Sequence, residues 1–283
     1  MRSGFVAVVG RTGVGKSALV NAMVGTKVTI TSKHPNTTRF PVHGILNRPG
    51  IQAVFVDTPG FHKPKTRLGE RLNSVAEDSL AGVDVAVFVV DASASIGPGD
   101  LLVAAKLGKS AICVVNKTDK VKGPQLVSQL IKAAEWDFSE YFPVSARTGK
   151  GVSELVETIS ARLPVGPAYY SMEEVTGTSE VAWVAELVRE ALLARVRQEL
   201  PHSMACRVIE WEWPYVRCEI LVERESQKPI VIGRNGTLLK EVGIAARKQL
   251  PEGTYLDLVV KVEKDWQSND RAIGLLGYGP DGV

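Results

Sequence analysis

The sequence has few cysteines and histidines, and none is arranged as a metal or redox site. Its three cysteines, Cys113, Cys206 and Cys218, lie far apart, whereas zinc and redox motifs place cysteines about two to four residues from each other. The four histidines are scattered too, and they form no recognisable nucleophilic triad with serine and aspartate. We therefore interpret the cysteines as small core residues and assign no metal to the histidines.

Long apolar runs are also missing. The longest, from Val83 to Val90, contains Asp84 and is far shorter than the roughly 20 residues that a membrane-spanning helix requires. A strand-like segment begins a few residues after Arg2, which predicts no signal peptide, so we expect a cytoplasmic protein. With 283 residues, 45% hydrophobic and 23% charged, and a net charge of +3, the chain is typical of a two-domain globular protein.

Strand-like and helix-like segments alternate through the first half of the chain. The strand candidates are Phe5–Val9, Gln52–Val56, Val83–Val90, Ser110–Val115 and Tyr141–Ser145, and the helix candidates are Lys16–Val24, Gly69–Leu80 and Val152–Leu163. This alternation predicts an α/β domain over residues 1–164, a mostly parallel sheet with helices on both faces. Residues 165–180 carry proline and glycine without periodicity, so they are the predicted linker.

Residues 181–283 favour a second, smaller α+β domain. An amphipathic helix is predicted from Val181 to Leu200, where Pro201 ends it. Strands are predicted over residues 204–213, 215–224 and 255–262, and in the second of these apolar and charged residues alternate as in a half-buried strand. Helices packed on one face of a small sheet fit this pattern.

The segment GRTGVGKS, from Gly10 to Ser17, follows a predicted strand and opens a predicted helix, as a phosphate-binding P-loop does. In such a loop backbone N–H groups converge on an anion, Lys16 reaches the β- and γ-phosphates, and Ser17 offers a hydroxyl to Mg²⁺. The residues expected to surround the phosphates are Gly10, Gly13, Val14, Gly15, Lys16, Ser17 and Ala18. The sequence therefore predicts a Mg²⁺-dependent nucleotide site.

A second motif, DTPG, closes the strand candidate at residues 52–56. Asp57 is placed to hold Mg²⁺ through water, and Gly60 to offer its N–H to the γ-phosphate. Taken alone the motif is more typical of a turn, because proline and glycine stand in favoured turn positions. Because it follows a P-loop in the sequence, we interpret the motif as part of the Mg²⁺- and γ-phosphate-binding site.

Two further motifs, NKTD and SAR, follow later strand candidates. A carboxylate at Asp119 accepts both N1–H and N2–H of guanine, whereas adenine would leave it unpaired, so we predict GTP and GDP as the ligands. The N–H of Ala146 is placed to bond guanine O6. The remaining residues of these motifs are Asn116, Lys117, Ser145 and Arg147. The ordered set resembles the translation-factor-related GTPases.

That resemblance also assigns a catalytic set of Lys16, Thr38 and Gly60. Thr38 would join Ser17 on Mg²⁺ and close over the γ-phosphate, with Thr37 as the alternative and a plain polar loop as the structural explanation. Many GTPases place a glutamine after the DxxG glycine, but this chain has Phe61, which cannot orient water. We expect slow intrinsic hydrolysis, on the order of 10⁻⁴ to 10⁻² per second.

A second glycine loop, GRNG from Gly233 to Gly236, lies near the end of the chain. Six basic residues surround it against two acidic ones: Arg224, Lys228, Arg234, Lys240, Arg247 and Lys248 against Glu225 and Glu241. The motif alone fits a helix–turn–helix corner. With its flanking helices and strand it fits a type II KH domain, which clamps about four single-stranded nucleotides. The predicted RNA-binding residues are Lys228, Ile232, Gly233, Arg234, Asn235, Gly236 and Lys240.

GTPase motifs followed by this loop make nearly the whole chain resemble the Era family of GTPases. The resemblance implies a monomeric switch that binds small-subunit ribosomal RNA near its 3′ end and acts in assembly and maturation of the small ribosomal subunit. The sequence departs from the family pattern in two places. The family usually has Pro-Asn where this chain has Thr12-Gly13, and that asparagine is associated with potassium-assisted hydrolysis. In the second glycine loop the family usually has Gly-Lys-Gly-Gly, whereas this chain has Gly-Arg-Asn-Gly.

Two rival functions remain at this stage. One is a constitutive RNA-binding protein whose GTPase domain serves as an anchor or nucleotide sensor. The other is peripheral contact with the inner face of the cell membrane, suggested by Lys63, Lys65 and Arg67, although three charges in a loop are more typical of a solvated surface.

Overall fold

A computed structural model of the chain describes residues 1–278, so residues 279–283 of the predicted C-terminal domain lie outside the described residues. The chain forms two compact units. The first comprises Met1–Thr29, Thr38–Pro64 and Leu72–Gly177, and the second comprises Ile30–Thr37, Lys65–Arg71 and the chain from Thr178 onward. Two short segments of the first half of the sequence therefore belong to the second unit.

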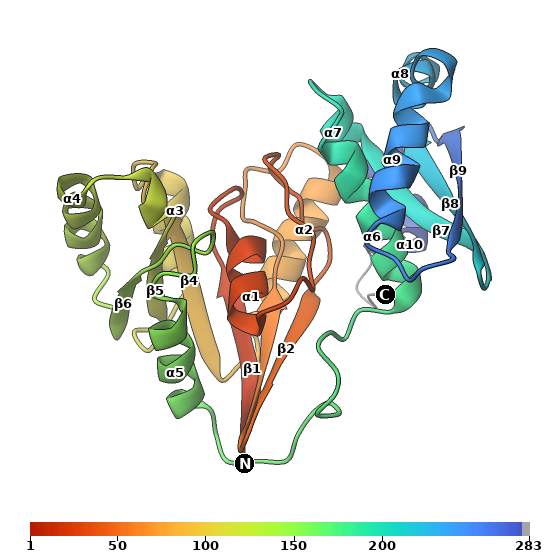
Figure 1. Ribbon diagram of the computed structural model, residues 1–283. Helices are drawn as coiled ribbons and strands as arrows, with labels where there is room; N and C mark the ends of the chain where they lie inside the picture. The colour runs from red at the N-terminus through yellow and green to blue at the C-terminus, as the bar shows by residue number, and fades with distance from the viewer. Residues whose placement is uncertain (279–283) are drawn as a thin grey trace. The chain divides into compact units, whose positions relative to one another are not determined.

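The first unit is built on a six-stranded sheet in the order β2-β3-β1-β4-β5-β6 (Figure 1). The strands are β1 (Arg2–Val9), β2 (Val42–Arg48), β3 (Ile51–Asp57), β4 (Val85–Asp91), β5 (Ile112–Asn116) and β6 (Glu140–Pro143). Only β2 is antiparallel to its neighbour. The mostly parallel sheet is as predicted, but β2 was not among the predicted strands, because Gly44 interrupts its apolar pattern at the sheet edge.

Helices cover both faces of this sheet. They are α1 (Lys16–Val24), α2 (Arg67–Asp78), α3 (Pro98–Ala104), α4 (Gly123–Ala134) and α5 (Val152–Arg162), with a 3₁₀ turn η1 (Thr118–Lys120). Successive residues of β1 serve the two faces in turn: Val6 and Val8 pack in the core with α1 and α5, whereas Ala7 and Val9 pack in the core with α3 and α4. Burial on both faces explains why the central strands are apolar throughout.

The carboxyl ends of four parallel strands lie at one edge of the sheet. β1, β3, β4 and β5 end at Val9, Asp57, Asp91 and Asn116. In open α/β sheets this edge is where ligands bind. The topology thus brings the segments that follow these strands together.

The predicted linker is hydrogen-bonded to the first unit over much of its length. The hydroxyl of Ser3 donates to the carbonyl of Pro167 at 2.6 Å, and the N–H of Ile45 donates to the carbonyl of Val175 at 2.8 Å. Its chain therefore runs along the sheet up to Gly177, the last residue of the first unit.

The second unit has a three-stranded sheet in the order β7-β8-β9. Its strands are β7 (Met204–Glu212), β8 (Tyr215–Val222) and β9 (Tyr255–Val262). Its helices are α6 (Glu180–Leu193), α7 (Leu200–Ser203), α8 (Lys228–Ile232), α9 (Thr237–Arg247) and α10 (Asp270–Leu275), with 3₁₀ turns η2 (Glu225–Gln227), η3 (Arg234–Gly236) and η4 (Trp266–Ser268). β8 pairs antiparallel with β7 and parallel with β9. α6 and α9 share one core with the sheet, the predicted α+β arrangement.

The prediction of one continuous helix from residue 181 to residue 200 is wrong. α6 ends at Leu193, and Gln198 has a positive φ of 59°, which no α-helix contains. The apolar spacing continues past the helix end because Val196 and Leu200 are also buried, at 5% and 4% exposed. The burial of these two side chains therefore produced the sequence pattern of a longer amphipathic helix.

Candidate functional site

The loop between β1 and α1 depends on glycines. Gly10, Gly13 and Gly15 have φ of 151°, 79° and 95°, which favour glycine. A Cβ on Gly15 would lie 2.6 Å from Nδ2 of Asn116, so a side chain there would collide with the end of β5. The loop leads into the N-terminus of α1, where N–H groups and the helix dipole favour an anion. The other predicted loop residues are Val14, which is buried, and Ala18, in the first turn of α1.

Lys16 is held inside this loop. Its side chain is 6% exposed, and its Nζ donates to the carbonyls of Gly10 at 3.2 Å and Arg11 at 3.1 Å. Burial lowers the pKa of Lys16 to about 8, and the charge of Asp57 opposes this only in part. A buried ammonium group in this position gains from an anion, so the geometry favours a phosphate ligand.

Three oxygen-bearing side chains meet beside Lys16. The hydroxyls of Ser17 and Thr38 are 2.9 Å apart, and Thr38 Oγ1 donates to Asp57 Oδ2 at 3.0 Å. Burial raises the pKa of Asp57, while the charge of Lys16 and hydrogen bonds from neighbouring hydroxyls oppose the rise. The structure thus brings together the three residues predicted to hold Mg²⁺.

Two observations test whether this cluster suits Mg²⁺. Asp57 Oδ1 is buried and has no hydrogen-bond partner among the described residues, so it is an acceptor that a cation or its bound water would satisfy. Carboxylate and hydroxyl oxygens are ligands that Mg²⁺ accepts. Within residues 1–278 no group of three or more His, Cys, Asp or Glu side chains could hold a metal. Mg²⁺ in proteins usually keeps several waters and is bound by one or two carboxylates together with substrate phosphates. The residues present fit Mg²⁺ bound together with a phosphate ligand.

Thr37 points elsewhere. Its hydroxyl lies 2.7 Å from that of Ser32 and donates to the carbonyl of His34 at 2.8 Å. The structure therefore brings Thr38, and not the alternative Thr37, to Ser17 and Asp57.

Gly60 lies against the P-loop. A Cβ on Gly60 would lie 2.6 Å from Cα of Thr12, and the N–H of Phe61 donates to the carbonyl of Gly10 at 3.2 Å. The Phe61 ring packs against the core that contains α3 and α4. The Phe61 side chain therefore contributes apolar packing beside the P-loop and no polar atom.

Asn116 joins the P-loop to the loop after β6. Its side chain is 1% exposed, its Nδ2 donates to the carbonyl of Val14 at 3.0 Å, and its Oδ1 accepts from the N–H of Ala146 at 3.0 Å. An amide is the side chain that can donate and accept in this way. Asn116 is thus a structural bridge within the candidate base-binding end.

Lys117 makes a second bridge to the P-loop. Its Nζ donates to the carbonyl of Gly13 at 2.5 Å and to Asp91 Oδ2 at 2.6 Å. Burial alone would raise the pKa of Asp91, but hydrogen bonds from Lys117 and Ser93 hold it below its ordinary value. Asp91 thus helps to hold a residue of the NKTD motif.

Asp119 lies at the surface, with its carboxylate side chain 14% exposed. Ser145 Oγ donates to its Oδ1 at 2.7 Å, and Arg147 Nε lies 3.7 Å from its Oδ2. The hydrogen bond from Ser145 lowers the pKa of Asp119. All the predicted residues of the NKTD and SAR motifs therefore converge on one end of the candidate site.

Three residues of the site were not found from the sequence. Asp91 ends β4, Asp100 is fully buried and binds Arg11 Nε at 2.6 Å, and Thr29 binds Asp57. For Asp91 the available signal was a carboxylate at the end of an apolar strand, as for Asp57. Asp100 and Thr29 carry no such signal.

A second candidate site lies in the second unit, at the loop between α8 and α9. Gly233, Asn235 and Gly236 have positive φ of 76°, 52° and 75°. A Cβ on Gly233 would lie 2.8 Å from the backbone nitrogen and Cβ of Leu238, so the turn admits only glycine there. Around Gly236 a Cβ would meet nothing within 4 Å, which leaves its backbone open to a ligand.

The side chains near this loop combine charge and apolar surface. Arg234, Asn235 and Lys240 are exposed, Lys228 and Ile232 are partly exposed, and the side chain of Ile230 is 53% exposed. The structure thus places the predicted RNA-binding residues together around one glycine turn. Their role in RNA binding stays a prediction.

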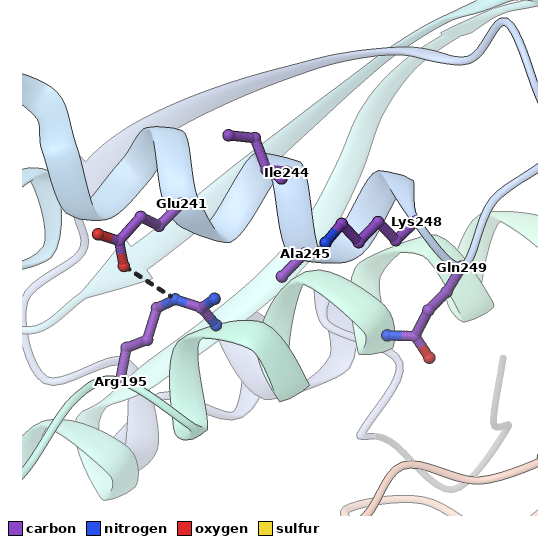
Figure 2. Close-up of a pocket in the computed structure, with 6 residues that line it drawn as sticks. All are labelled: Arg195, Glu241, Ile244, Ala245, Lys248 and Gln249. Carbon is purple, nitrogen blue, oxygen red and sulfur yellow. Dashed lines mark hydrogen bonds and ion pairs between the residues drawn. The ribbon is translucent and has the colours of Figure 1, made fainter.

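A pocket of about 400 Å³ lies elsewhere in the second unit, between α9 and the residues after α6. Figure 2 shows Arg195 and Glu241 facing each other across it, with Nε and Oε2 3.4 Å apart. Its other lining residues are Ile244, Ala245, Lys248 and Gln249. The predicted RNA-binding residues do not line it.

Two family models match the chain. One, described as 50S ribosome-binding GTPase, matches residues 5–117, and one described as KH domain matches residues 199–267. Among the helices of residues 1–278, none has the length and apolarity needed to cross a membrane.

Named relatives match over almost the whole chain. GTPase Era of Mycobacterium avium (strain 104) is 45% identical over 295 residues, covering 98% of this chain and 99% of the relative. GTPase Era of Mycobacterium leprae (strain TN) is 46% identical over 297 residues, with the same coverage. Both relatives carry the same name.

A solved structure of Era in complex with MgGDPNP and nucleotides 1506–1542 of 16S ribosomal RNA is 36% identical to this chain. It superposes with a TM-score of 0.94 and covers 99% of both chains. A variant of Aquifex aeolicus Era bound to GDP and AlF4⁻ is 35% identical, with a TM-score of 0.93 over 99% of this chain and all of the other.

Proposed function

The chain belongs to the Era family of GTPases, and we propose that it is a GTP-hydrolysing switch that binds small-subunit ribosomal RNA near its 3′ end during small-subunit assembly and maturation. One observation carries the proposal above all. A phosphate- and Mg²⁺-compatible cluster of Lys16, Ser17, Thr38 and Asp57 occurs in one chain with a KH-type glycine turn at Gly233–Gly236.

The phosphates lie, in this proposal, on the P-loop and the first turn of α1. Lys16 binds the β- and γ-phosphates, and the N–H of Gly60 binds the γ-phosphate. Ser17 and Thr38 ligate Mg²⁺, and Asp57 reaches it through water; when bound, Mg²⁺ neutralises charge on the phosphate oxygens. The residues that surround the phosphates are Gly10, Gly13, Val14, Gly15, Lys16, Ser17 and Ala18.

Asp119 selects guanine by accepting its N1–H and N2–H. The hydrogen bond from Ser145 supports this role, because it favours the charged carboxylate and fixes its position. The N–H of Ala146 turns from Asn116 Oδ1 to guanine O6. Asn116, Lys117 and Arg147 hold the surrounding loops.

Hydrolysis is slow in this proposal because the residue directly after Gly60 has no polar atom that could orient the attacking water. Phe61 occupies that position and packs into the core of the first unit. Catalysis then rests on phosphate positioning and charge neutralisation.

The switch output is RNA binding by the second unit. Its glycine turn lets phosphates approach the backbone, and Arg234, Lys228 and Lys240 supply positive charge. Residues 30–37 and 65–71 belong to the second unit although they lie next to Thr38 and shortly after Gly60 in sequence. A change at Thr38 or Gly60 on hydrolysis is therefore transmitted along the chain into the unit that binds RNA.

The test compares two glycines with matched surroundings. Gly236 and Gly253 both have positive φ, 75° and 88°, and a Cβ at either position would meet nothing within 4 Å. Gly236→Asp is expected to abolish binding of a short single-stranded RNA from the small-subunit 3′ end, whereas Gly253→Asp should bind like the wild type. Equal loss in both variants, or none in Gly236→Asp, would exclude the glycine turn as the binding site.

The rival, constitutive RNA binding, is decided by nucleotide state. The switch predicts different RNA affinities with a GTP analogue and with GDP, and equal affinities would favour the rival. Sedimentation with isolated small and large ribosomal subunits tests which subunit the protein binds. The test is needed because the description of the matching GTPase family model names the large (50S) subunit.

We further propose that the protein acts as a monomer in the cytoplasm. Peripheral membrane contact through Lys63, Lys65 and Arg67 is the alternative. Sedimentation with anionic vesicles distinguishes the two, because only the alternative predicts binding that salt reverses.

A further inference from the structure

Thr29 is a buried polar residue that no motif explains. It lies between α1 and β2 in the first unit and is 2% exposed. Its Oγ1 donates to Asp57 Oδ2 at 2.9 Å, across 28 residues of sequence. Thr29 therefore contacts the carboxylate assigned to Mg²⁺ without lying in the P-loop or the DTPG motif.

One side chain of α1 holds the backbone of Thr29. Asn21 Nδ2 donates to the Thr29 carbonyl at 2.9 Å, and Asn21 Oδ1 accepts from the N–H groups of Val28 at 2.9 Å and Thr29 at 3.1 Å. Asn21 lies four residues after Ser17, so both side chains lie on the same face of α1. Thr29 is thus fixed relative to the helix that carries the phosphate- and cation-binding residues.

The two oxygens of Asp57 are used differently. Oδ2 accepts from both Thr29 and Thr38, whereas Oδ1 is buried and has no hydrogen-bond partner among residues 1–278. Two donors on one oxygen fix the rotation of the carboxylate. Consequently Oδ1 is the oxygen left to face a cation or its water.

The two donors are not equivalent. Both residues adjoin the segment Ile30–Thr37 of the second unit, but Thr38 is the proposed cation ligand, and a cation ligand must be able to turn its hydroxyl from Asp57 to the metal. The backbone of Thr29 makes two hydrogen bonds to Asn21, and the N–H of the preceding Val28 donates a third to the same side chain, so the position of Thr29 is fixed relative to α1. Thr29 is therefore the donor that keeps Asp57 oriented when Thr38 moves.

We propose that Thr29 is a positioning residue for Mg²⁺, which aims Asp57 Oδ1 at the cation site in both nucleotide states. The inference rests on the proposed Mg²⁺ role of Ser17, Thr38 and Asp57. Hydrogen bonds to metal-binding carboxylates orient them, and their loss lowers metal affinity about 10- to 100-fold. The bland explanation is a buried threonine that only satisfies its own hydroxyl.

The experiment measures how strongly free Mg²⁺ slows the release of fluorescently labelled GDP from the full chain. Thr29→Val removes the hydroxyl at nearly constant shape, and Thr29→Ser keeps it. Thr254→Val is the matched control, because Thr254 is 9% exposed and its hydroxyl donates to the carbonyl of Pro251 at 2.6 Å in the second unit. Melting temperature is recorded for each variant.

The expected result is a 10- to 100-fold higher half-maximal Mg²⁺ concentration for Thr29→Val, roughly the range for lost metal-positioning contacts. GDP affinity in EDTA should be unchanged, and Thr29→Ser and Thr254→Val should match the wild type. An unchanged Mg²⁺ midpoint with a lowered melting temperature would show a structural role only, and weaker GDP binding in EDTA would show a disturbed phosphate loop. A wild type that ignores Mg²⁺ would instead overturn the metal site itself.

Discussion

Arg189 and Glu186 form a buried ion pair on one turn of α6. Nε and Nη2 of Arg189 lie 2.8 and 2.5 Å from the two carboxylate oxygens, and the residues are 1% and 7% exposed. The same guanidinium donates to the backbone carbonyl of Thr37, which belongs to the same unit. One arginine thus ties the segment preceding Thr38 to the first helix of the second unit.

Breaking this pair should destabilise the second unit strongly. Arg189→Met leaves the Glu186 carboxylate buried and unpaired, which costs about 3–5 kcal/mol. Adding Glu186→Leu removes that charge too and should restore much of the loss. Urea unfolding followed by tryptophan fluorescence measures both, since the second unit holds Trp183, Trp211, Trp213 and Trp266. A double variant as unstable as the sum of the singles would contradict the ion-pair explanation.

Nucleotide binding should take up a proton at mildly alkaline pH. Lys16 has a pKa of about 8 because burial disfavours its charge. Bound phosphates favour the charged form, so at pH 8.5 the site gains most of one proton, and at pH 6.5 it gains almost none. Calorimetry in buffers of different ionisation enthalpy counts the protons. Uptake of the same size at both pH values would show that Lys16 is not the group responsible.

The same lowered pKa affects stability of the nucleotide-free protein. The unfolded chain holds the Lys16 proton up to the ordinary lysine pKa of 10.5, whereas the folded chain loses it near a pKa of about 8. The unfolded state therefore binds more protons between these values, and this contribution rises with pH across that window. Relative to Lys16→Met, the wild type should gain stability from pH 8 to pH 10. A constant difference in urea midpoint would contradict the assignment.

Asp119→Asn should lose GTP while keeping its fold. The amide oxygen can still accept from Ser145, but the amide nitrogen faces guanine N1–H and N2–H with a donor. A site built to pair polar groups rejects a mismatched partner by roughly 10⁴-fold. Equilibrium GDP affinity is the measurement, and Asp137→Asn, which changes an exposed aspartate paired to Lys109, is the control. Weakening below about tenfold would argue against Asp119 as the guanine acceptor.

Hydrolysis should be slow and equal in KCl and NaCl. Gly13 stands where the family usually has the asparagine associated with potassium, and Phe61 offers no polar atom. Gly13 has φ of 79°, and a Cβ there would meet nothing within 4 Å. Asparagine tolerates such φ, so Gly13→Asn should fit and introduce a potassium advantage. Single-turnover rates in the two salts decide, and a large potassium advantage in the wild type would overturn this expectation.

Much of the site was predictable because its motifs are short and stand at strand ends. Gly10–Ser17, Asp57–Gly60 and Asn116–Asp119 each place their functional groups within a few consecutive residues. Parallel strands then bring these segments to one edge of the sheet. Local spacing together with fold class was therefore enough to predict which segments form the candidate nucleotide site.

The edge strand and the helix after the linker show where local patterns fail. β2 pairs with β3 from Val42 to Arg48 and buries Val42, Ile45 and Leu46, although Gly44 interrupts the apolar pattern that signals a strand. Buried Val196 and Leu200 extend an apolar period beyond the end of α6. In both cases tertiary contacts override the local signal.

The sequence by itself determined which chemical groups belong to the candidate nucleotide site, because their identities and order are written in contiguous motifs. Only the tertiary structure decided how these groups are held. Lys117 pairs with Asp91 across 26 residues, Thr29 with Asp57 across 28, Arg11 with Asp100 across 89, and Arg189 with Thr37 across 152. A hydrogen bond depends on distance and direction in space, and no spacing along the chain encodes such a pair until the fold brings both partners together.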